Sequence, residues 1–104
     1  MTFEIDAEID RSHPALPGHF PGNPMVPAVV ILAEVSAAIR AAFGSEAEIT
    51  RLPAVKFLAP LLPGERCRVV LEPTGAAALR FTVTRDGRRI ALGTAEYSRG
   101  AASG

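Results

Sequence analysis

The stretch GHFPGNPMVP (residues 18–27), followed by the apolar run AVVILAEVSAAIRAAF (residues 28–43), decides the fold of this chain. Each of the three prolines in the first segment fixes its own φ and disfavours the α region for the residue before it. The segment is therefore predicted to be a rigid, extended loop that holds His19. No residue of the second segment breaks a helix, and Gly44 is a typical stop signal. We predict one helix over residues 28–43, with Pro27 in its first turn.

The predicted helix is apolar almost all round, because only Glu34, Ser36 and Arg40 are polar within it. Such a helix is buried, either in a membrane or in a protein core. It is shorter than the roughly 20 residues that span a bilayer, and it carries Glu34 in its middle. We therefore expect no membrane span, and a helix covered on nearly all sides by strands from the rest of the chain.

Segments with patterns typical of strands precede and follow the predicted helix in the sequence. Apolar and polar residues alternate strictly over residues 2–10, which is typical of an antiparallel strand with one solvent-exposed face. Similar patterns predict strands over residues 49–52, 54–58, 66–72, 79–84 and 89–98. Pro53 should lie at an edge or a bulge, residues 73–77 should form a loop, and Asp86-Gly87 is a hairpin signal. The sequence thus predicts an α+β fold with one helix on five or six antiparallel strands.

Two details of these strands carry further expectations. Cys67 alternates with arginines and is predicted to be a small buried hydrophobe, because nothing adjacent would activate its thiol. The small residues Ala91, Gly93 and Ala95 share one face of the last strand, where they would let the helix approach the sheet closely.

Length and composition narrow the function. The chain suits a single domain over residues 1–98 with a flexible tail over residues 99–104. Its formal net charge of zero favours neither nucleic acid nor an acidic membrane. The charges are uneven, with seven acids and two bases in residues 1–50 and nine bases and four acids after them. That basic half could face an acidic partner, although solvated strand faces are the simpler interpretation.

Other sequence features bear on location and cofactors. One cysteine excludes an internal disulfide, and nothing resembles a signal peptide, so we expect a cytoplasmic protein. No metal cluster, phosphate loop or nucleotide fingerprint appears in the sequence, and we expect no cofactor.

Two segments resemble those of hot-dog-fold 3-hydroxyacyl-[acyl carrier protein] dehydratases. Residues 18–27 resemble the family's active-site pattern G-H-F-P-G-x-P-x-x-P-G, and KFLAPLLPGE (residues 56–65) resembles K-F-x-x-P-x-x-P-G-D/E. The short length of the chain is similar to that of the compact dehydratase-like proteins of aryl-polyene and related pigment pathways. The resemblance implies a hot-dog fold, in which the sheet wraps one long central apolar helix, and a dimer with sheets joined edge to edge.

The resemblance also implies roles for individual residues. His19 would be the base that removes the C2 proton of the substrate, since a histidine pKa lies near neutrality. The backbone N–H of Ala28, where the family has glycine, would polarise the thioester carbonyl at the positive end of the helix. Phe20, Gly22 and Met25 would contact the substrate.

The position of the acid departs from the family pattern. The family's Asp or Glu lies fourteen positions after the histidine, which here is Ala33, and Glu34 follows one residue later. One residue turns a side chain by about 100° around a helix. Three interpretations are open: a shifted helix phase that lets Glu34 serve as the acid, slow dehydration with His19 alone, or loss of dehydration. A carboxylate satisfied structurally at a dimer interface is a further alternative for Glu34.

The resemblance finally implies partners. The substrate would arrive on the phosphopantetheine of an acyl carrier protein, or as acyl-CoA, and the histidine and acid of one site would come from different subunits. A homodimer is expected, with a heterodimer as the alternative. A hot-dog thioesterase, or a non-catalytic acyl-thioester-binding or partner subunit, remains the competing function. The direction of Glu34 discriminates between these alternatives.

Overall fold

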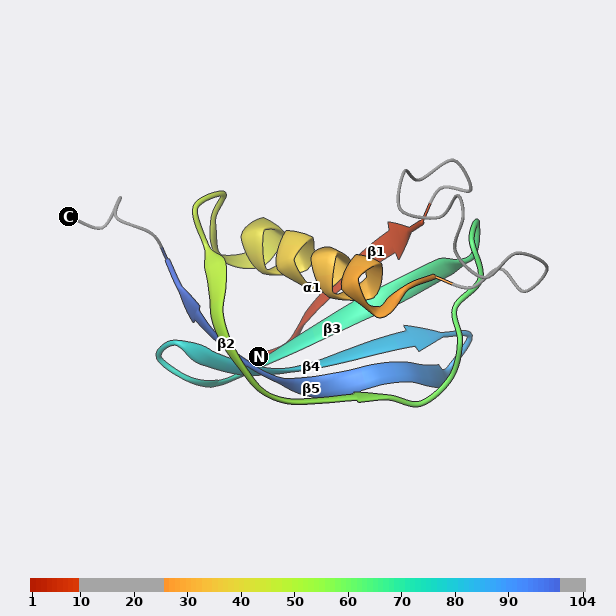
Figure 1. Cartoon of the computed structure of the whole chain (residues 1–104). Helices are drawn as coiled ribbons and strands as arrows, with labels where there is room; N and C mark the ends of the chain where they lie inside the picture. The colour runs from red at the N-terminus through yellow and green to blue at the C-terminus, as the bar shows by residue number, and fades with distance from the viewer. Residues whose placement is uncertain (10–25, 100–104) are drawn as a thin grey trace.

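The structure is a computed structural model that describes residues 1–9 and 26–99 (Figure 1). The described part of the chain contains these elements: β1 (Phe3–Glu8), α1 (Ala28–Phe43), β2 (Glu48–Phe57), β3 (Arg66–Gly75), β4 (Ala78–Arg85) and β5 (Arg88–Ser98). The strands form one sheet in the order β1-β3-β4-β5-β2, and all neighbouring pairs are antiparallel. α1 lies along one face of this sheet, as Figure 1 shows. The predicted α+β architecture with one helix and an antiparallel sheet is confirmed.

The hydrophobic core lies between α1 and the sheet. Alternate residues of β3 and β4 point toward the helix, because side chains along a strand alternate between its two faces. Removing a large apolar side chain from water contributes about 1.5–3 kcal/mol. The largest fully buried side chains are Phe81, Ile9, Ile39, Leu61, Leu71, Leu79, Ile90, Val35, Val69 and Val83. Cys67 is buried among them at 5% exposure, as predicted.

The expectation of a helix covered on nearly all sides was wrong for the single chain. α1 buries Val30, Ile31, Val35, Ala38 and Ile39. Its opposite face is exposed to solvent and carries Val29, Ala33, Ala37, Arg40 and Ala41. One sheet covers only one face of a helix, and the exposed face consists mostly of alanines, which expose little apolar surface.

Helix α1 has the predicted bounds but a different start. It begins at Ala28, and Pro27 is the N-cap residue with an extended backbone (φ −62°, ψ 151°) rather than part of the first turn. The Pro27 carbonyl accepts hydrogen bonds from the N–H groups of Val30 and Ile31, at 3.0 and 3.2 Å. At the other end, the Gly44 N–H donates to the Arg40 carbonyl, and Gly44 has φ 121°, a value that favours glycine.

Strand β2 joins the two short strands that the sequence predicts around Pro53. It is continuous from Glu48 to Phe57 and pairs with β5 through two register shifts, between Ile49 and Arg51 and between Arg51 and Ala54. Pro53 lies in the second irregular stretch, and β2 is an edge strand of the sheet. The missing N–H of the proline is tolerated there because no ladder hydrogen bond is lost.

Strand β3 continues through Pro73 to Gly75, so the predicted loop over residues 73–77 was wrong in its first half. Pro73 pairs with Leu79 of β4, whereas the pairing of β3 with β1 ends at Leu71 and Phe3. Beyond Leu71, β3 therefore behaves as an edge on its β1 side, and a proline fits there. The predicted hairpin is confirmed: Asp86 and Gly87, between β4 and β5, have φ values of 50° and 79°.

The glycine of β5 has a different role from the one we expected. A Cβ atom at Gly93 would collide with the carbonyl oxygen of Ala54 on β2 and with the ring of Phe81 on β4. The absent side chain therefore makes room for two neighbouring strands, not for the helix. Gly93 lets the irregular part of β2 lie close to β5 while the Phe81 ring covers the glycine.

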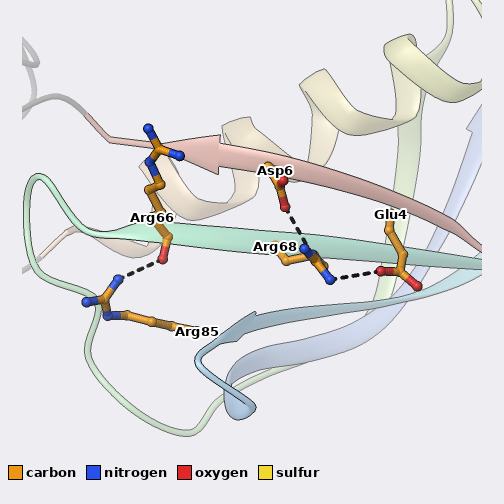
Figure 2. Close-up of polar contacts among 5 residues, drawn as sticks. All are labelled: Glu4, Asp6, Arg66, Arg68 and Arg85. Carbon is orange, nitrogen blue, oxygen red and sulfur yellow. Dashed lines mark hydrogen bonds and ion pairs between the residues drawn. The ribbon is translucent and has the colours of Figure 1, made fainter.

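The outer face of the sheet carries a ladder of ion pairs. Figure 2 shows Arg68 of β3 between Asp6 and Glu4 of β1, with N···O distances of 3.0 and 3.1 Å. These pairs are exposed, so each contributes little to stability. They nevertheless match the register, in which Asp6 lies opposite Arg68 and Glu8 opposite Arg66. No helix within the described residues is long and apolar enough to cross a membrane.

Candidate functional site

The segment 58–65 positions the surroundings of the helix start. The N–H groups of Leu58 and Ala59 donate to the carbonyl of Ile90 on β5, at 2.8 and 3.3 Å. The N–H of Val26 donates to the carbonyl of Leu61 at 2.7 Å. One segment, which carries the second family-like motif, thus ties the start of β5 to the residues that lead into α1.

The same segment also reaches the end of β1. The N–H of Gly64 donates to the carbonyl of Ile9 at 2.7 Å, and Gly64 has a positive φ of 85°. The side chain of Glu65 accepts a hydrogen bond from the N–H of Leu62 at 2.8 Å, which closes the turn between them. The segment is therefore held along its length by backbone hydrogen bonds.

An apolar groove lies at the N-terminal end of α1. Its volume is about 430 Å³, and it is lined by Val26, Ala28, Ile31, Phe57, Ala59, Pro60 and Leu61. Phe57 is 44% exposed, which is unusual for a large aromatic side chain and leaves its ring accessible at the groove. A groove of this kind accepts an apolar chain, and its lining is formed by the helix start and the second motif together.

Ala28 stands where the groove meets the helix terminus. It is the first residue of α1, and its side chain is exposed. The first N–H groups of a helix have no acceptor within the helix and point outward from its positive end. The N-cap residue Pro27 supplies no side-chain hydrogen bond to them. The arrangement can therefore polarise a carbonyl oxygen that enters the groove.

Glu34 lies at the boundary between the buried and exposed faces of α1. It is half-buried, three residues after Ile31 in the groove lining and four before the buried Ala38. Ala33 is exposed and shares its face with Val29. A step of about 100° thus separates the exposed Ala33 from the half-buried Glu34.

Glu34 and Cys67 are linked electrostatically across the core. Cys67 is buried on the core face of β3, and burial is the main cause that raises the pKa of its thiol. The negative charge of Glu34 raises this pKa further, whereas Arg85 lowers it. The Glu34 charge on α1 thus acts on the thiol of β3, in agreement with the half-buried position of Glu34.

Several predicted site residues lie outside the described residues. These are His19, Phe20, Gly22 and Met25. The structure thus brings Ala28 to the groove and Glu34 to the helix boundary, and the meeting of His19 with Glu34 stays a prediction. Within residues 1–9 and 26–99, no group of three or more His, Cys, Asp or Glu side chains could hold a metal ion.

Most residues of the groove lining were not predicted from the sequence. Val26, Ile31, Phe57, Pro60 and Leu61 were not among the predicted site residues. The available signal was the apolar character of the second motif, in which Phe57, Leu58 and Leu62 are large and remain exposed. Such exposure of neighbouring large apolar residues marks a binding surface.

The chain was compared with known protein families and with curated proteins. The model of the ApeI-like family, described as ApeI dehydratase, matches residues 1–94. A comparison with curated proteins finds no match.

Solved structures support the fold. An uncharacterized protein from Erwinia carotovora subsp. atroseptica is 25% identical with a TM-score of 0.76, over 93% of this chain and 82% of that one. The dehydratase heterocomplex ApeI:P from Xenorhabdus doucetiae is 22% identical with a TM-score of 0.78, over 92% and 86%. A 1,4-dihydroxy-2-naphthoyl-CoA thioesterase from Synechocystis is 14% identical with a TM-score of 0.70, over 93% and 80%.

These likenesses confirm the predicted hot-dog fold, in which dehydratases and thioesterases share one architecture. Fold alone does not separate the two activities. The family model matches residues 1–94, nearly the whole chain, and shows the family. The chain belongs to the ApeI-like dehydratase family.

Proposed function

We propose that this protein removes water from a 3-hydroxyacyl thioester. His19 takes the C2 proton, and the electron pair of that C–H bond forms the C2=C3 double bond. Glu34, in its protonated form, donates a proton to the C3 hydroxyl group as the C3–O bond breaks, and water leaves. His19 ends protonated and Glu34 ionised, and proton exchange with solvent restores both.

The position of Glu34 is the observation that carries this proposal. The family position of the acid is occupied by Ala33, which faces solvent on α1. Glu34 lies at the helix boundary, one helical turn from Ile31 in the groove lining. A carboxyl group one helical turn from the lining of an apolar groove can serve as the proton donor to a leaving hydroxyl group.

The groove would hold the substrate. The thioester carbonyl would accept a hydrogen bond from the Ala28 N–H, which stabilises the charge that develops on the enolate oxygen. The apolar part of the acyl chain would lie against Ile31 and Phe57. Phe20, Gly22 and Met25 belong to the segment that precedes the helix and would complete the wall of the groove.

The proposed substrate carrier is the phosphopantetheine arm of an acyl carrier protein. We further propose that a second hot-dog chain completes the site, either a copy of this chain or a homologue. The exposed face of α1 and the free edge of β2 support this proposal, as does the description of one structural neighbour as a heterocomplex. Light scattering of the purified chain, alone and with a co-expressed homologue, distinguishes the two assemblies.

The enzymatic test is dehydration of a 3-hydroxyacyl thioester, or hydration of the enoyl thioester, followed by ultraviolet absorbance. His19→Ala and Glu34→Gln should each lower kcat by about 10²–10⁴-fold. Glu46→Gln is the matched control, because Glu46 is an exposed acid in the α1–β2 connection. Full activity of Glu34→Gln would remove Glu34 from the mechanism.

The same assay separates the competing functions. Release of free thiol without loss of water would indicate a thioesterase. Binding of the thioester without either reaction, in both the single chain and the mixed assembly, would indicate a non-catalytic subunit. In each of these cases the dehydratase proposal fails.

A further inference from the structure

Arg85 lies at the end of β4, on the side of the sheet that faces α1. Leu79, Phe81 and Val83 of this strand are buried on that face, and the alternation of side chains assigns Arg85 to the same face. Its ion pair with Glu65 is the least exposed of those formed within the described part of the chain, with 33% and 26% of the two side chains exposed. Solvent therefore screens this pair less than the ion pairs on the outer face of the sheet.

All three nitrogens of the Arg85 guanidinium have an oxygen partner. Nε lies 3.0 Å from the Glu65 carboxylate, and Nη1 donates to the Arg66 carbonyl at 3.0 Å, a contact that Figure 2 shows. Nη2 lies 3.9 Å from the Asp86 carboxylate. One side chain thus joins the end of the segment 58–65, the start of β3 and the β4–β5 turn, which lie at one end of the molecule (Figure 1). These contacts of Arg85 are called the arginine clamp.

The arginine clamp reaches the apolar groove through Glu65. One carboxylate oxygen of Glu65 pairs with Arg85, and the other accepts a hydrogen bond from the N–H of Leu62 at 2.8 Å. The preceding residue, Leu61, lines the groove, and its carbonyl accepts the N–H of Val26 ahead of α1. The guanidinium is therefore connected to the groove wall through one carboxylate and one peptide link.

The middle of the segment 58–65 depends on this side-chain contact. Pro60 and Pro63 have no N–H group and cannot be fixed by a hydrogen bond from their own nitrogen. The N–H of Leu62 lies between them and donates to the Glu65 side chain. The place of the groove wall at Pro60 is therefore sensitive to where the Glu65 carboxylate is held.

We propose that Arg85 is a positioning residue, which acts through Glu65 to hold the groove wall formed by Pro60 and Leu61 at the distance from α1 that an acyl chain requires. This inference rests on the proposed function, because it concerns binding of the same substrate. A guanidinium suits the role, since its planar group donates in several fixed directions, which a lysine ammonium does not reproduce. A displaced wall would weaken contacts with a long acyl chain and leave a short one nearly unaffected.

The kinetic test compares two acyl lengths in Arg85→Met, which removes the guanidinium and keeps an unbranched side chain. We expect KM for the 3-hydroxyoctanoyl N-acetylcysteamine thioester to rise by at least about fivefold, and KM for the 3-hydroxybutanoyl thioester to change by less than about twofold. Arg68→Met is the matched control, because Arg68 also pairs with two carboxylates, but on the outer face of the sheet. It should change both constants by less than about twofold. Equal changes for the two substrates in Arg85→Met would overturn the proposal.

Glu65→Gln tests the same connection from its other partner, and it decides the proposal by itself if Arg85→Met does not fold. It removes the charge that Arg85 contacts but keeps a side-chain oxygen for the N–H of Leu62. It should show the same dependence on acyl length, and Arg85→Lys should recover part of the wild-type KM. The double variant Arg85→Met/Glu65→Gln should be no worse than the more affected single variant, because both remove one contact. Additive effects would mean that the two residues act separately, and the proposal would fail.

Amide hydrogen exchange, followed by NMR, gives a readout that does not need turnover. In Arg85→Met, the amides of Val26 and Leu62 should exchange at least about tenfold faster, whereas those of Val69 and Phe81 in the sheet should change by less than about twofold. A purely structural role of Arg85 would accelerate exchange in the sheet as well.

The exchange pattern also separates the two proposals. If wild type turns over neither thioester while exchange accelerates only at Val26 and Leu62, the proposed function fails and the arginine clamp stands. If both thioesters are turned over and exchange at these amides is unchanged in Arg85→Met, the arginine clamp fails and the dehydratase proposal stands.

Discussion

The two ends of helix α1 are built differently. At the N-terminal end, Pro27 offers no side-chain cap, and Ala28 faces an apolar groove. At the C-terminal end, the ring of Phe43 stacks on Tyr97 with centroids 4.8 Å apart and meets Phe3 edge-on at 5.0 Å. The guanidinium of Arg99 lies over the Phe43 ring at 5.1 Å. One end is open and accessible, and the other is closed by aromatic packing.

The difference separates stability from function along a single helix. Aromatic pairs contribute beyond their buried area, so the closed end anchors α1 to the first and last strands. The open end leaves helix N–H groups and apolar side chains accessible, which costs stability but provides a site for a polar carbonyl and an apolar chain. Substitutions at the two ends should therefore change different measured quantities.

The largest effect is expected from moving the carboxyl group by one residue. The double substitution Ala33→Glu/Glu34→Ala keeps the composition and uses two good helix formers, so the helix should remain. It moves the carboxyl group about 100° onto the exposed face. We expect kcat for dehydration to fall by about 100-fold with little change in the melting temperature.

The single substitution Ala33→Glu is the control for this experiment, because it retains Glu34 while adding the exposed acid. It should keep most of the activity. If the transposed protein were as active as wild type, the acid would act from the family position, and the boundary location of Glu34 would have no catalytic meaning.

The next effect concerns the closed end. Phe43→Ala removes both aromatic contacts and should lower the free energy of unfolding by about 2–3 kcal/mol. For a domain of this size, the melting temperature should fall by roughly 10 °C or more. Chemical denaturation followed by circular dichroism measures the change.

Phe57→Ala is the matched substitution at the open end. Phe57 is 44% exposed, so its loss should change the free energy of unfolding by less than about 1 kcal/mol. It should instead raise KM for the acyl thioester. Equal losses of stability from the two phenylalanine substitutions would contradict the contrast between the ends of α1.

The sequence predicted the elements well because their signals are local. Period-two alternation identified residues 2–10 and 66–72, and the mostly apolar run without a helix breaker before Gly44 identified α1 to the residue. The errors arose where tertiary context decides. Pro73 continues β3 because β1 has already ended beside it, and no local pattern contains that information.

The candidate site was harder to predict. The first motif indicated chemistry, but the groove is formed by residues that are distant in sequence, such as Ile31 and Pro60. Gly93 illustrates the same limit. A side chain at this position would collide with Ala54 and Phe81 on neighbouring strands, and no local sequence pattern shows that. Periodicity assigns a residue to a face of its own element, and only the fold brings two elements together.

A smaller effect is expected on the reactivity of Cys67 when the charge of Glu34 is removed. Because burial and then Glu34 raise the Cys67 pKa, Glu34→Gln should lower that pKa and increase the thiolate fraction at a given alkaline pH. Alkylation by iodoacetamide should become severalfold faster. An unchanged rate would place the carboxylate away from β3.

The same pKa shift predicts a pH dependence of stability. A thiol whose pKa is raised by folding contributes its full stability below its ordinary pKa of about 8.5. That contribution is lost as the pH rises from there through the raised pKa of the folded state. Wild type should therefore lose stability in this alkaline range, and Cys67→Ala, measured by urea denaturation across the same range, should lose less.

The smallest effect is expected at Arg99, which closes the aromatic end of α1. Its guanidinium lies 5.1 Å from the centroid of Phe43 and 5.8 Å from that of Tyr97. Exposed cation–π contacts contribute about 0.5–1 kcal/mol, so Arg99→Ala should lower the free energy of unfolding by that amount. Arg99→Lys keeps the charge and should lose only part of it. Neither variant should change kcat, because the closed end lies beyond Glu34 from the groove; a catalytic defect here would mean that the two ends of the helix are coupled.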